Sequence, residues 1–286
     1  MKLLRFGPPG HERPGTLDAD GKIRDLSSVV RDIDGEALSP AGLKRLQGID
    51  IRTLPVVPGA PRLGVPVAAV GKFVAIGLNY SDHAKESNMA IPTEPVVFMK
   101  ATTCLSGPYD DVIKPKRSTK LDWEVEIGIV IGTIARSVSA ADALDFVAGY
   151  CLVNDVSERN FQLERGGSWD KGKSFDTFGP VGPWVVTRDE VGDVQDLGMW
   201  LDVNGTRMQT GNTRTMIFSC AQIVSYVSEV MTLLPGDIVT TGTPPGVGAG
   251  MKPPRFLNAG DVMSLGIDKL GEQRQRVVAY PGGPRP

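Results

Sequence analysis

The sequence predicts a mixed α+β fold that is mainly β. Segments with the pattern of strands outnumber those with the pattern of helices, and the two do not alternate as they would in a doubly wound sheet. The clearest strand is the β-branched run 125–131, and the clearest hairpin spans 200–208 around an Asn-Gly turn. The clearest helix spans 219–234, where apolar residues recur at three-to-four spacing.

Shorter elements are expected on both sides of these three. They are two strands in 15–23 around an Asp-Gly-containing turn, a helix that opens at Ser39-Pro40, a helix from Ser139 to about Phe146, a strand at 150–156, and strands that begin at Pro235 and Ala259. The stretch 54–66 suits an extended connector because it is rich in proline and glycine. We therefore predict a small N-terminal α+β domain over 1–70 and a larger domain over 71–286.

The composition excludes several classes of protein. Of the 286 residues, 41% are hydrophobic and 22% are charged, as in a globular protein with a core. The net charge of -2 gives no electrostatic reason to expect nucleic acid or an anionic membrane as a partner. No apolar run approaches the roughly 20 residues of a membrane-spanning helix, and Arg5 interrupts the place where a targeting segment would be apolar. We therefore expect a cytoplasmic protein.

Cysteine and histidine are scarce. Cys104, Cys151 and Cys220 form no CxxC pair, so they predict neither a disulfide framework nor a thiolate zinc site. Only two histidines, His11 and His83, are present, which almost excludes a metal site built on imidazoles. A metal in this protein would therefore bind to carboxylates, and oxygen ligands favour hard cations such as Mg²⁺, Mn²⁺ or Ca²⁺.

Three acidic side chains beside two expected strands are candidate metal ligands. Side chains alternate between the faces of a strand, so Glu124 and Glu126 project to the same side. The apolar run after them indicates the mouth of a buried strand, where two carboxylates repel unless solvent or a cation separates them. Asp155, at the end of the next strand, offers a third oxygen ligand. The alternatives are a surface strand with two solvated glutamates and an aspartate that only caps a turn.

His83 and Glu86 are a candidate general base and its partner. If a helix begins near Ser81, residues three apart share one face, and the carboxylate can hydrogen-bond the imidazole. Such a pair fixes the tautomer of the histidine and raises its basicity, as a water-activating base requires. The alternative is an exposed histidine in an ordinary helical ion pair.

Two loops carry further polar candidates. Lys171 and Lys173 stand on either side of a glycine, and they are either functional cations or simply solvated. The glycine-rich stretch 242–248 lacks the Gly-Lys-Ser/Thr ending of a phosphate loop. Its amides and the hydroxyl of Thr243 could bind a carboxylate, and the alternative is a plain hairpin turn.

Taken in order, these segments resemble the fumarylacetoacetate hydrolase superfamily over residues 70 to about 280. The resemblance rests on segments that follow the family's order, which are 77–83 (GLNYSDH), 97–100 (VFMK), 122–126 (DWEVE), 154–159 (NDVSER), 172–177 (GKSFDT), 203–205 (VNG) and 241–248 (TGTPPGVG). Each segment is weak alone, and the ordered set is specific. Ala101 departs from the family, which often has proline after the lysine, but it touches no proposed role.

The resemblance implies a fold and a metal site. The fold would be a pseudo-β-barrel of mixed sheets, in a homodimer, with the metal at the mouth of the barrel. Glu124, Glu126 and Asp155 match the family's metal ligands and would hold Mg²⁺ or Mn²⁺ as the cofactor.

The resemblance also implies roles for five other residues. His83 and Glu86 would form the dyad that activates water, on a segment that orders over the substrate. Lys173 and Gln162 would contact the keto oxygens of the substrate, and Thr243 would contact its carboxylate.

The implied activity is metal-dependent hydrolysis of a C–C bond in a 2,4-diketo acid, which gives pyruvate and a smaller acid. The segments 1–8 and 15–18 look like those of a bacterial subgroup that includes 2,4-diketo-3-deoxy-sugar acid hydrolases. Relatives there are often labelled ureidoglycolate lyases, so C–N cleavage is the second hypothesis and oxaloacetate-type decarboxylation the third. A binding protein without turnover is disfavoured, because a pure binder needs no general base such as His83.

Overall fold

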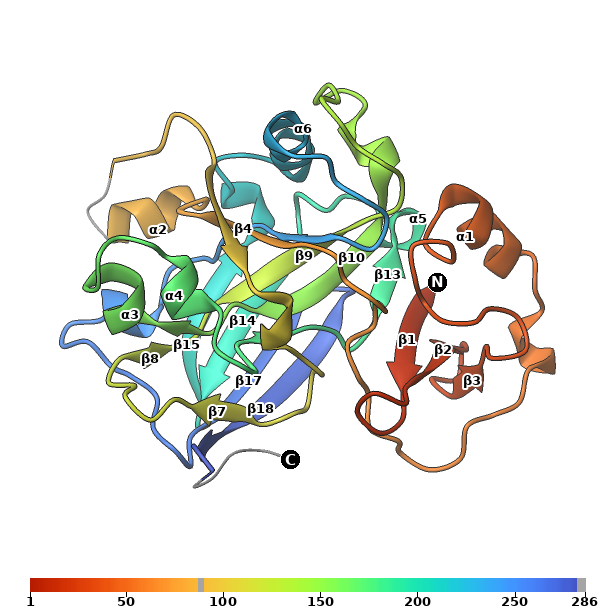
Figure 1. The fold of residues 1–286 in the computed structure, drawn as a ribbon, viewed down its shortest axis with the longest axis horizontal. Coiled ribbons are helices and arrows are strands. Elements are labelled where there is room, and N and C mark those ends of the chain that lie inside the picture. Colours follow the sequence, from red (N-terminus) through yellow and green to blue (C-terminus); the bar gives the residue numbers. More distant parts are fainter. Residues whose placement is uncertain (87–89, 282–286) are drawn as a thin grey trace.

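The computed structural model describes residues 1–86 and 90–281 (Figure 1). Residues 282–286, the end of the predicted larger domain, lie outside the described residues. The strands form two large sheets and two pairs of short strands. The predicted α+β fold, mainly β, is therefore confirmed, and the sheets of the described residues are open rather than closed into a barrel.

The larger sheet has nine strands in the order β3, β2, β1, β13, β10, β9, β16, β4, β5. In chain order these are β1 (Lys2–Phe6), β2 (Arg13–Leu17), β3 (Ile23–Asp25), β4 (Phe73–Gly77), β5 (Val96–Lys100), β9 (Val125–Ile131), β10 (Val147–Asn154), β13 (Val185–Thr187) and β16 (Ile238–Thr240). All residues of β9 and β10 are buried, as the β-branched run in β9 predicts.

The second sheet has five strands in the order β15, β14, β17, β18, β7. These are β7 (Val112–Lys114), β14 (Gly198–Val203), β15 (Thr206–Asn212), β17 (Val262–Ile267) and β18 (Gly271–Ala279). The short pairs are β8 (Leu121–Asp122) with β11 (Ser157–Glu158), and β6 (Leu105–Ser106) with β12 (Gly179–Pro180). The hairpin β14–β15 turns at Asn204 and Gly205, both at positive φ, as the Asn-Gly pair predicts. Residues of both large sheets share one hydrophobic core.

The helices are short. They are α1 (Pro40–Gln47), α2 (Ser81–Glu86), α3 (Arg159–Leu163), α4 (Asp170–Lys173), α5 (Arg188–Val191) and α6 (Cys220–Val230), with 3₁₀ turns at Ile51–Thr53, Thr102–Cys104, Ala143–Phe146, Thr213–Thr215 and Gly248–Gly250. Among the described residues, no helix has the length and apolar character needed to cross a membrane.

Local sequence signals predict two of the helix starts correctly and one incorrectly. Ser39 caps α1, and Ser219 caps α6 through a capping box, both as the sequence predicts. The prediction of a helix from Ser139 to about Phe146 is wrong for its first half, because the residues before Ala143 are not helical. The Ser139 hydroxyl accepts a hydrogen bond from the Asp142 amide, which makes a local turn, and only a 3₁₀ helix follows at Ala143–Phe146.

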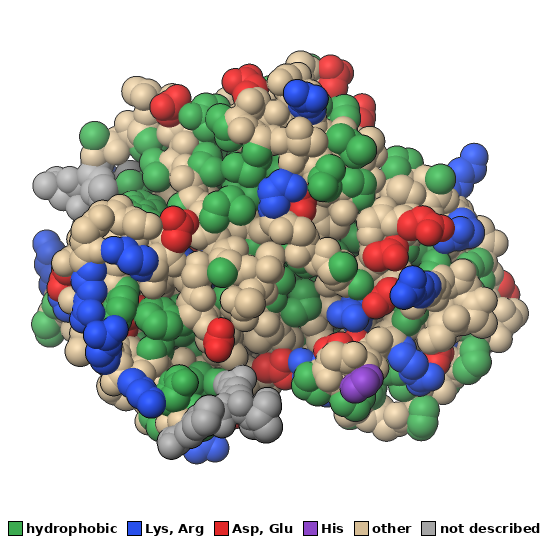
Figure 2. Space-filling model, viewed as in Figure 1, with side chains coloured by type: hydrophobic (Ala, Val, Ile, Leu, Met, Phe, Trp, Pro, Cys, Tyr) green, Lys and Arg blue, Asp and Glu red, His purple; other side chains and the backbone are tan. Residues whose placement is uncertain are grey.

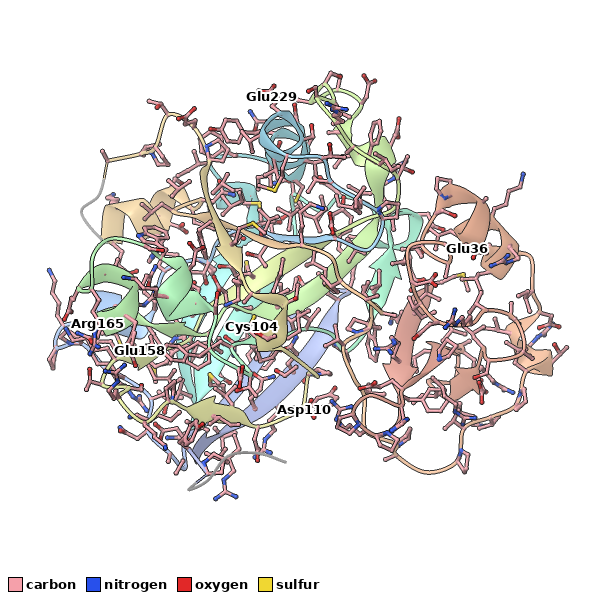
Figure 3. The ribbon with its side chains drawn as sticks, in the orientation of Figure 1. Glu36, Cys104, Asp110, Glu158, Arg165 and Glu229 are labelled. Carbon is pink, nitrogen blue, oxygen red and sulfur yellow. The ribbon has the colours of Figure 1, made fainter. Side chains whose placement is uncertain are left out.

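Residues 1–70 extend the larger sheet. β1 pairs antiparallel with β13, with Lys2 opposite Val186, so this unit, on the right of Figure 1, continues the hydrogen-bonded ladder. Arg62 also bridges the junction, because it bonds Glu12 at 2.9 Å and Asp110 at 2.5 Å. Figure 3 labels Asp110 at that junction. The division at residue 70 remains a prediction.

The strand directions bring distant segments to one end of the larger sheet. β9 runs antiparallel to its neighbours β10 and β16, and β16 runs parallel to β4. The start of β9 therefore lies beside the ends of β10, β16 and β4. The segments that leave these strands converge at that end.

Candidate metal and active site

The eight residues predicted for the site line one cavity of about 530 Å³. They are His83, Glu86, Glu124, Glu126, Asp155, Gln162, Lys173 and Thr243. The cavity lies at the start of β9, between α2, α3, α4 and the loop 242–254. The structure thus brings together residues that are spread over most of the larger predicted domain. Their individual roles remain predictions.

The three candidate ligands form a compact acidic group. One ligand oxygen each from Glu124, Glu126 and Asp155 can be chosen so that all lie within 4.8 Å of one another, and all three residues are buried. Glu124 precedes β9, Glu126 lies in its second position, and Asp155 follows β10. A group of three convergent carboxylates is suited to a hard divalent cation.

Two buried lysines neutralise part of this charge. Lys173 Nζ lies 2.6 Å from both Glu124 Oε2 and Asp155 Oδ2, and Lys100 Nζ lies 2.6 Å from Asp155 Oδ1. Lys100 also donates to the carbonyl oxygen of Lys173, which anchors the end of α4. Burial alone would lower the pKa of Lys173. The carboxylates of Asp155 and Glu124 outweigh that effect, and the pKa of Lys173 is raised.

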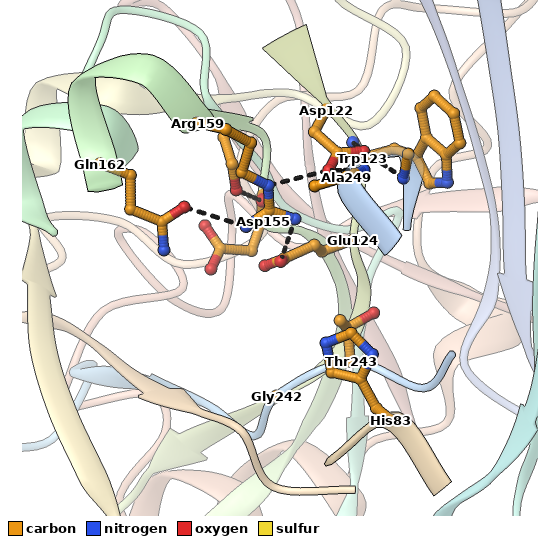
Figure 4. Close-up of polar contacts among 12 residues, drawn as sticks. His83, Asp122, Trp123, Glu124, Asp155, Arg159, Gln162, Gly242, Thr243 and Ala249 are labelled. Atoms are coloured by element: carbon orange, nitrogen blue, oxygen red, sulfur yellow. Dashed lines mark hydrogen bonds and ion pairs between the residues drawn. The ribbon is translucent and has the colours of Figure 1, made fainter. Parts of the chain in front are cut away.

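Arg159 is the third buried cation, at the start of α3. Its Nη2 lies 2.6 Å from Glu124 Oε1 and its Nε 2.8 Å from Asp122 Oδ2 (Figure 4). Asp122 also accepts hydrogen bonds from the amides of Gly248 and Ala249, so the arginine connects the acidic group to the loop that lines the cavity. Arg159, Asp122 and Glu124 thus each have an oppositely charged partner, as burial of a charge requires.

Glu126 differs from the other two carboxylates. Burial opposes the charged form of Glu124, but Arg159 and Lys173 outweigh it and lower its pKa to about 2. Burial, with Asp155 and Glu124 nearby, raises the pKa of Glu126 well above its usual value. No described basic side chain lies within ion-pair distance of Glu126, which accepts from the Gly242 amide at 2.9 Å. A bound divalent cation would supply the missing positive charge, so the residues fit such an ion.

His83 and Glu86 form the expected pair on α2. His83 Nδ1 lies 3.1 Å from Glu86 Oε2, and His83 is buried while Glu86 is partly exposed. Both oxygens of Glu86 accept from the Gly246 amide at 3.2 Å. Gly246 has φ +101°, and a Cβ there would lie 1.9 Å from the carbonyl oxygen of Met208, so only glycine fits this turn.

Gln162 and Thr243, two of the three predicted substrate contacts, differ in how many of their hydrogen-bonding groups are already used. Gln162 Oε1 accepts from Arg159 Nη1 at 3.0 Å, and within the described residues its Nε2 donates no hydrogen bond. The Thr243 hydroxyl donates to the carbonyl of Val125 at 2.9 Å and accepts from Gln209 at 2.8 Å. Its proton is therefore already used inside the protein. The stretch 242–248 is a loop that contacts the acidic group, and it is not a hairpin turn.

Apolar side chains form most of the rest of the wall. Phe98 and Trp169 stack edge to face with centroids 5.4 Å apart, and Trp169 lies against Gly77, where a Cβ would meet its ring at 2.4 Å. The cysteines take no part. Cys104, labelled in Figure 3, is buried like the other two, and burial raises its thiol pKa to about 11. A thiolate nucleophile is therefore not indicated.

Sequence reasoning gave no role to Arg159 or Lys100, although both stand in segments of the family pattern. Arg159 stands four residues after Asp155 and Lys100 stands at the end of an apolar strand, but neither position indicates which carboxylates the side chain pairs with. Trp169 had no signal, because its neighbours Gly77 and Phe98 are far away in sequence.

Comparisons with known proteins agree with this geometry. The family model described as the C-terminal part of fumarylacetoacetate (FAA) hydrolase matches residues 72–278. A protein from Burkholderia ambifaria that carries only a provisional hydrolase name is 64% identical over 276 residues, which are 96% of this chain and 98% of the relative.

Solved structures are similar over nearly the whole chain. Fumarylacetoacetate hydrolase from Exiguobacterium antarcticum matches with a TM-score of 0.86 and 35% identity, over 98% of this chain and 100% of that one. Maleylpyruvate hydrolase from Sphingobium sp. SYK-6, in complex with manganese(II) and pyruvate, matches with a TM-score of 0.81 and 31% identity, over 98% and 100%. A 2-hydroxyhepta-2,4-diene-1,7-dioate isomerase from Mycobacterium marinum matches with a TM-score of 0.75 and 32% identity, over 99% and 100%. This chain therefore belongs to the fumarylacetoacetate hydrolase family.

Proposed function

We propose that this protein is a divalent-metal-dependent hydrolase that cleaves a C–C bond of a 2,4-diketo acid and releases pyruvate. The observation that carries the proposal is a single cavity lined by three convergent carboxylates and by a paired histidine. The similar maleylpyruvate hydrolase, whose structure contains manganese(II) and pyruvate, supports both the metal and the product.

In the proposed site, Glu124, Glu126 and Asp155 hold Mg²⁺ or Mn²⁺. The ion would polarise the oxygens of the keto acid and withdraw electrons from the reacting carbons. Gln162 has an unused amide donor that lines the cavity, and it would bind a keto oxygen of the substrate. Contact between Thr243 and the substrate carboxylate would need the hydroxyl to give up its bond to Val125.

The protein's own groups would perform the proton transfers. When the Nδ1–H of His83 donates to Glu86, its Nε2 is free to take a proton from water. The resulting hydroxide equivalent adds to the C4 carbonyl. The C3–C4 bond then breaks, and its electron pair leaves with C3 as the enolate of pyruvate. Lys173 and Arg159 place positive charge beside that enolate, and the proton that His83 took from water is transferred to C3, which completes pyruvate.

The surface beside the cavity favours an anionic substrate. Figure 2 shows Lys and Arg side chains gathered at the left edge of the molecule, where Figure 1 places α3 and β8. α3 contributes Arg159 and Gln162 to the cavity wall. Positive surface charge near a site raises the local concentration of anions such as keto acids.

Other reactions can start from the same residues. The similar isomerase favours isomerisation of an unsaturated 2-hydroxy diacid as a second candidate. Ureidoglycolate lysis and oxaloacetate-type decarboxylation remain the weaker hypotheses from the sequence. The homodimer and the cytoplasmic location also remain predictions.

The first test is pyruvate release from a panel of 2,4-diketo acids. The panel includes a 2,4-diketo-3-deoxy-sugar acid and maleylpyruvate, each with Mg²⁺, with Mn²⁺ and after chelation. We expect pyruvate from at least one of them, and only with metal. Isomerised product, glyoxylate from ureidoglycolate, or pyruvate from oxaloacetate alone would replace hydrolysis with the corresponding alternative.

A further inference from the structure

Gln209 on β15 is a buried side chain that reaches the backbone between two of the candidate metal ligands. Its Oε1 accepts from the Val125 amide at 3.0 Å. Its Nε2 donates to the Thr243 hydroxyl and to the Pro244 carbonyl, each at 2.8 Å. The residue is fully buried and does not line the cavity.

These bonds close a ring around the Val125 peptide. Gln209 accepts from the Val125 amide and donates to the Thr243 hydroxyl, and that hydroxyl donates to the Val125 carbonyl. Val125 stands between Glu124 and Glu126, so the orientation of its two peptide groups sets where both carboxylates point. The hydrogen-bonded ring therefore fixes the backbone on which the acidic group depends.

The chain needs such a partner at this place because the strand pairing is interrupted. Trp123 and Glu124 lie between β8 and β9, outside both strands. The Glu124 amide donates to the side chain of Asn154 at 3.2 Å, and the Val125 amide donates to Gln209. Two buried side-chain amides thus replace backbone partners where the ligands leave the regular sheet, since buried backbone groups require hydrogen bonds.

We infer that Gln209 is a positioning residue for the candidate metal site. It touches neither ion nor substrate, and it acts through the Val125 peptide and the loop 242–244. The inference rests on the proposed function, because it assumes that Glu124 and Glu126 bind the ion. Residues that orient metal ligands typically change metal affinity about 10- to 100-fold when they are removed.

The test is Mn²⁺ binding to the metal-stripped protein without substrate, followed through the electron paramagnetic resonance signal of free Mn²⁺. Gln209→Met keeps the length of the side chain and removes its three hydrogen bonds. We expect its dissociation constant for Mn²⁺ to rise about 10- to 100-fold. Gln195→Met is the matched control. Gln195 also accepts from a backbone amide, that of Cys220, and donates to a backbone carbonyl, but its partners lie away from the acidic group.

A purely structural role would lower the unfolding temperature of both glutamine variants and leave Mn²⁺ affinity unchanged well below that temperature. Thr243→Val breaks the same ring without removing Gln209, and it serves if Gln209→Met does not fold. We expect weaker Mn²⁺ binding from it as well. The inference would be overturned if folded Gln209→Met and Thr243→Val bound Mn²⁺ with wild-type affinity while Glu126→Gln lost Mn²⁺ binding. The proposed metal site would then still hold. Wild-type affinity in Glu126→Gln would overturn both.

Discussion

The two sides of the cavity are built in different ways. The acidic side stands at the ends of buried, hydrogen-bonded strands, and every one of its charged groups except Glu126 has an ion-pair partner within the described residues. The side with His83 stands on the six-residue helix α2. Within the described residues, the polar contacts of α2 include those of Asp82 with Thr215 and of Glu86 with Gly246.

The difference indicates that the two sides of the cavity have different functions. Strand pairing and buried ion pairs hold ligand atoms in fixed positions, as a metal site requires. A short helix that is not part of the sheets can move at smaller cost than a paired strand, as a segment that closes over a substrate requires. We therefore expect substitutions on the acidic side to change metal binding, and substitutions around α2 to change turnover while metal binding stays intact.

The largest effect is expected from Glu126→Gln. The change removes one of three charges that would bind the ion and keeps the shape of the side chain. Metal-dependent turnover should fall below detection, and Mn²⁺ affinity should be lost. Because Glu126 has no described basic partner, the apo variant should unfold at a temperature no lower than the wild type. Turnover of Glu126→Gln at the wild-type rate would exclude Glu126 as a metal ligand.

The second effect is expected from His83→Ala. Loss of a general base typically slows a reaction by about 10² to 10⁴. Turnover should fall within that range, while Mn²⁺ affinity and the binding of the non-cleavable keto-acid mimic oxalate should stay within about twofold of wild type. His11→Ala is the matched control, because His11 is the other histidine and lies outside the cavity. Equal turnover in the two variants would exclude His83 as the base.

Local rules account for the parts of the site that the sequence predicted. Glu124 and Glu126 lie two residues apart, and His83 and Glu86 three apart, so strand and helix periodicity bring each pair together. The partners that the sequence analysis missed are remote. Arg159 lies 35 residues from Glu124 and Lys100 lies 55 from Asp155. No local pattern encodes these ion pairs, which depend on the tertiary fold.

The fold shows the same limit. Strands, the Asn-Gly hairpin and the capped helices carry their signals within a few residues. The place of β1 in the sheet does not, because its partner Val186 lies far from Lys2 in the chain. The helix expected from Ser139 failed for another reason. A serine and an acidic residue three positions later can form a local turn as well as a helix cap, and here the turn is formed.

A third, smaller effect is expected from Gly246→Ala, which acts on the loop that supports Glu86. The added Cβ would lie 1.9 Å from the Met208 carbonyl, so the loop must move and the bond to Glu86 must lengthen. Misplacing a catalytic group by about 1 Å can cost about 10²-fold in rate, and turnover should fall by about that factor at unchanged Mn²⁺ affinity. Gly205→Ala is the control. It has a similar φ of +76°, but its Cβ would meet nothing within 4 Å.

The smallest effect, and the sharpest test of the comparison, is the stabilisation by Mn²⁺. An ion that binds only the folded protein adds about 2.7 kcal/mol at 100 times its dissociation constant. Wild type and His83→Ala should gain that stability equally in thermal unfolding with and without chelator, because the ion would be held by the strand ends and not by α2. Glu126→Gln should gain none. If His83→Ala lost the stabilisation as well, α2 would contribute to metal binding, and the proposed separation between the two sides of the cavity would be wrong.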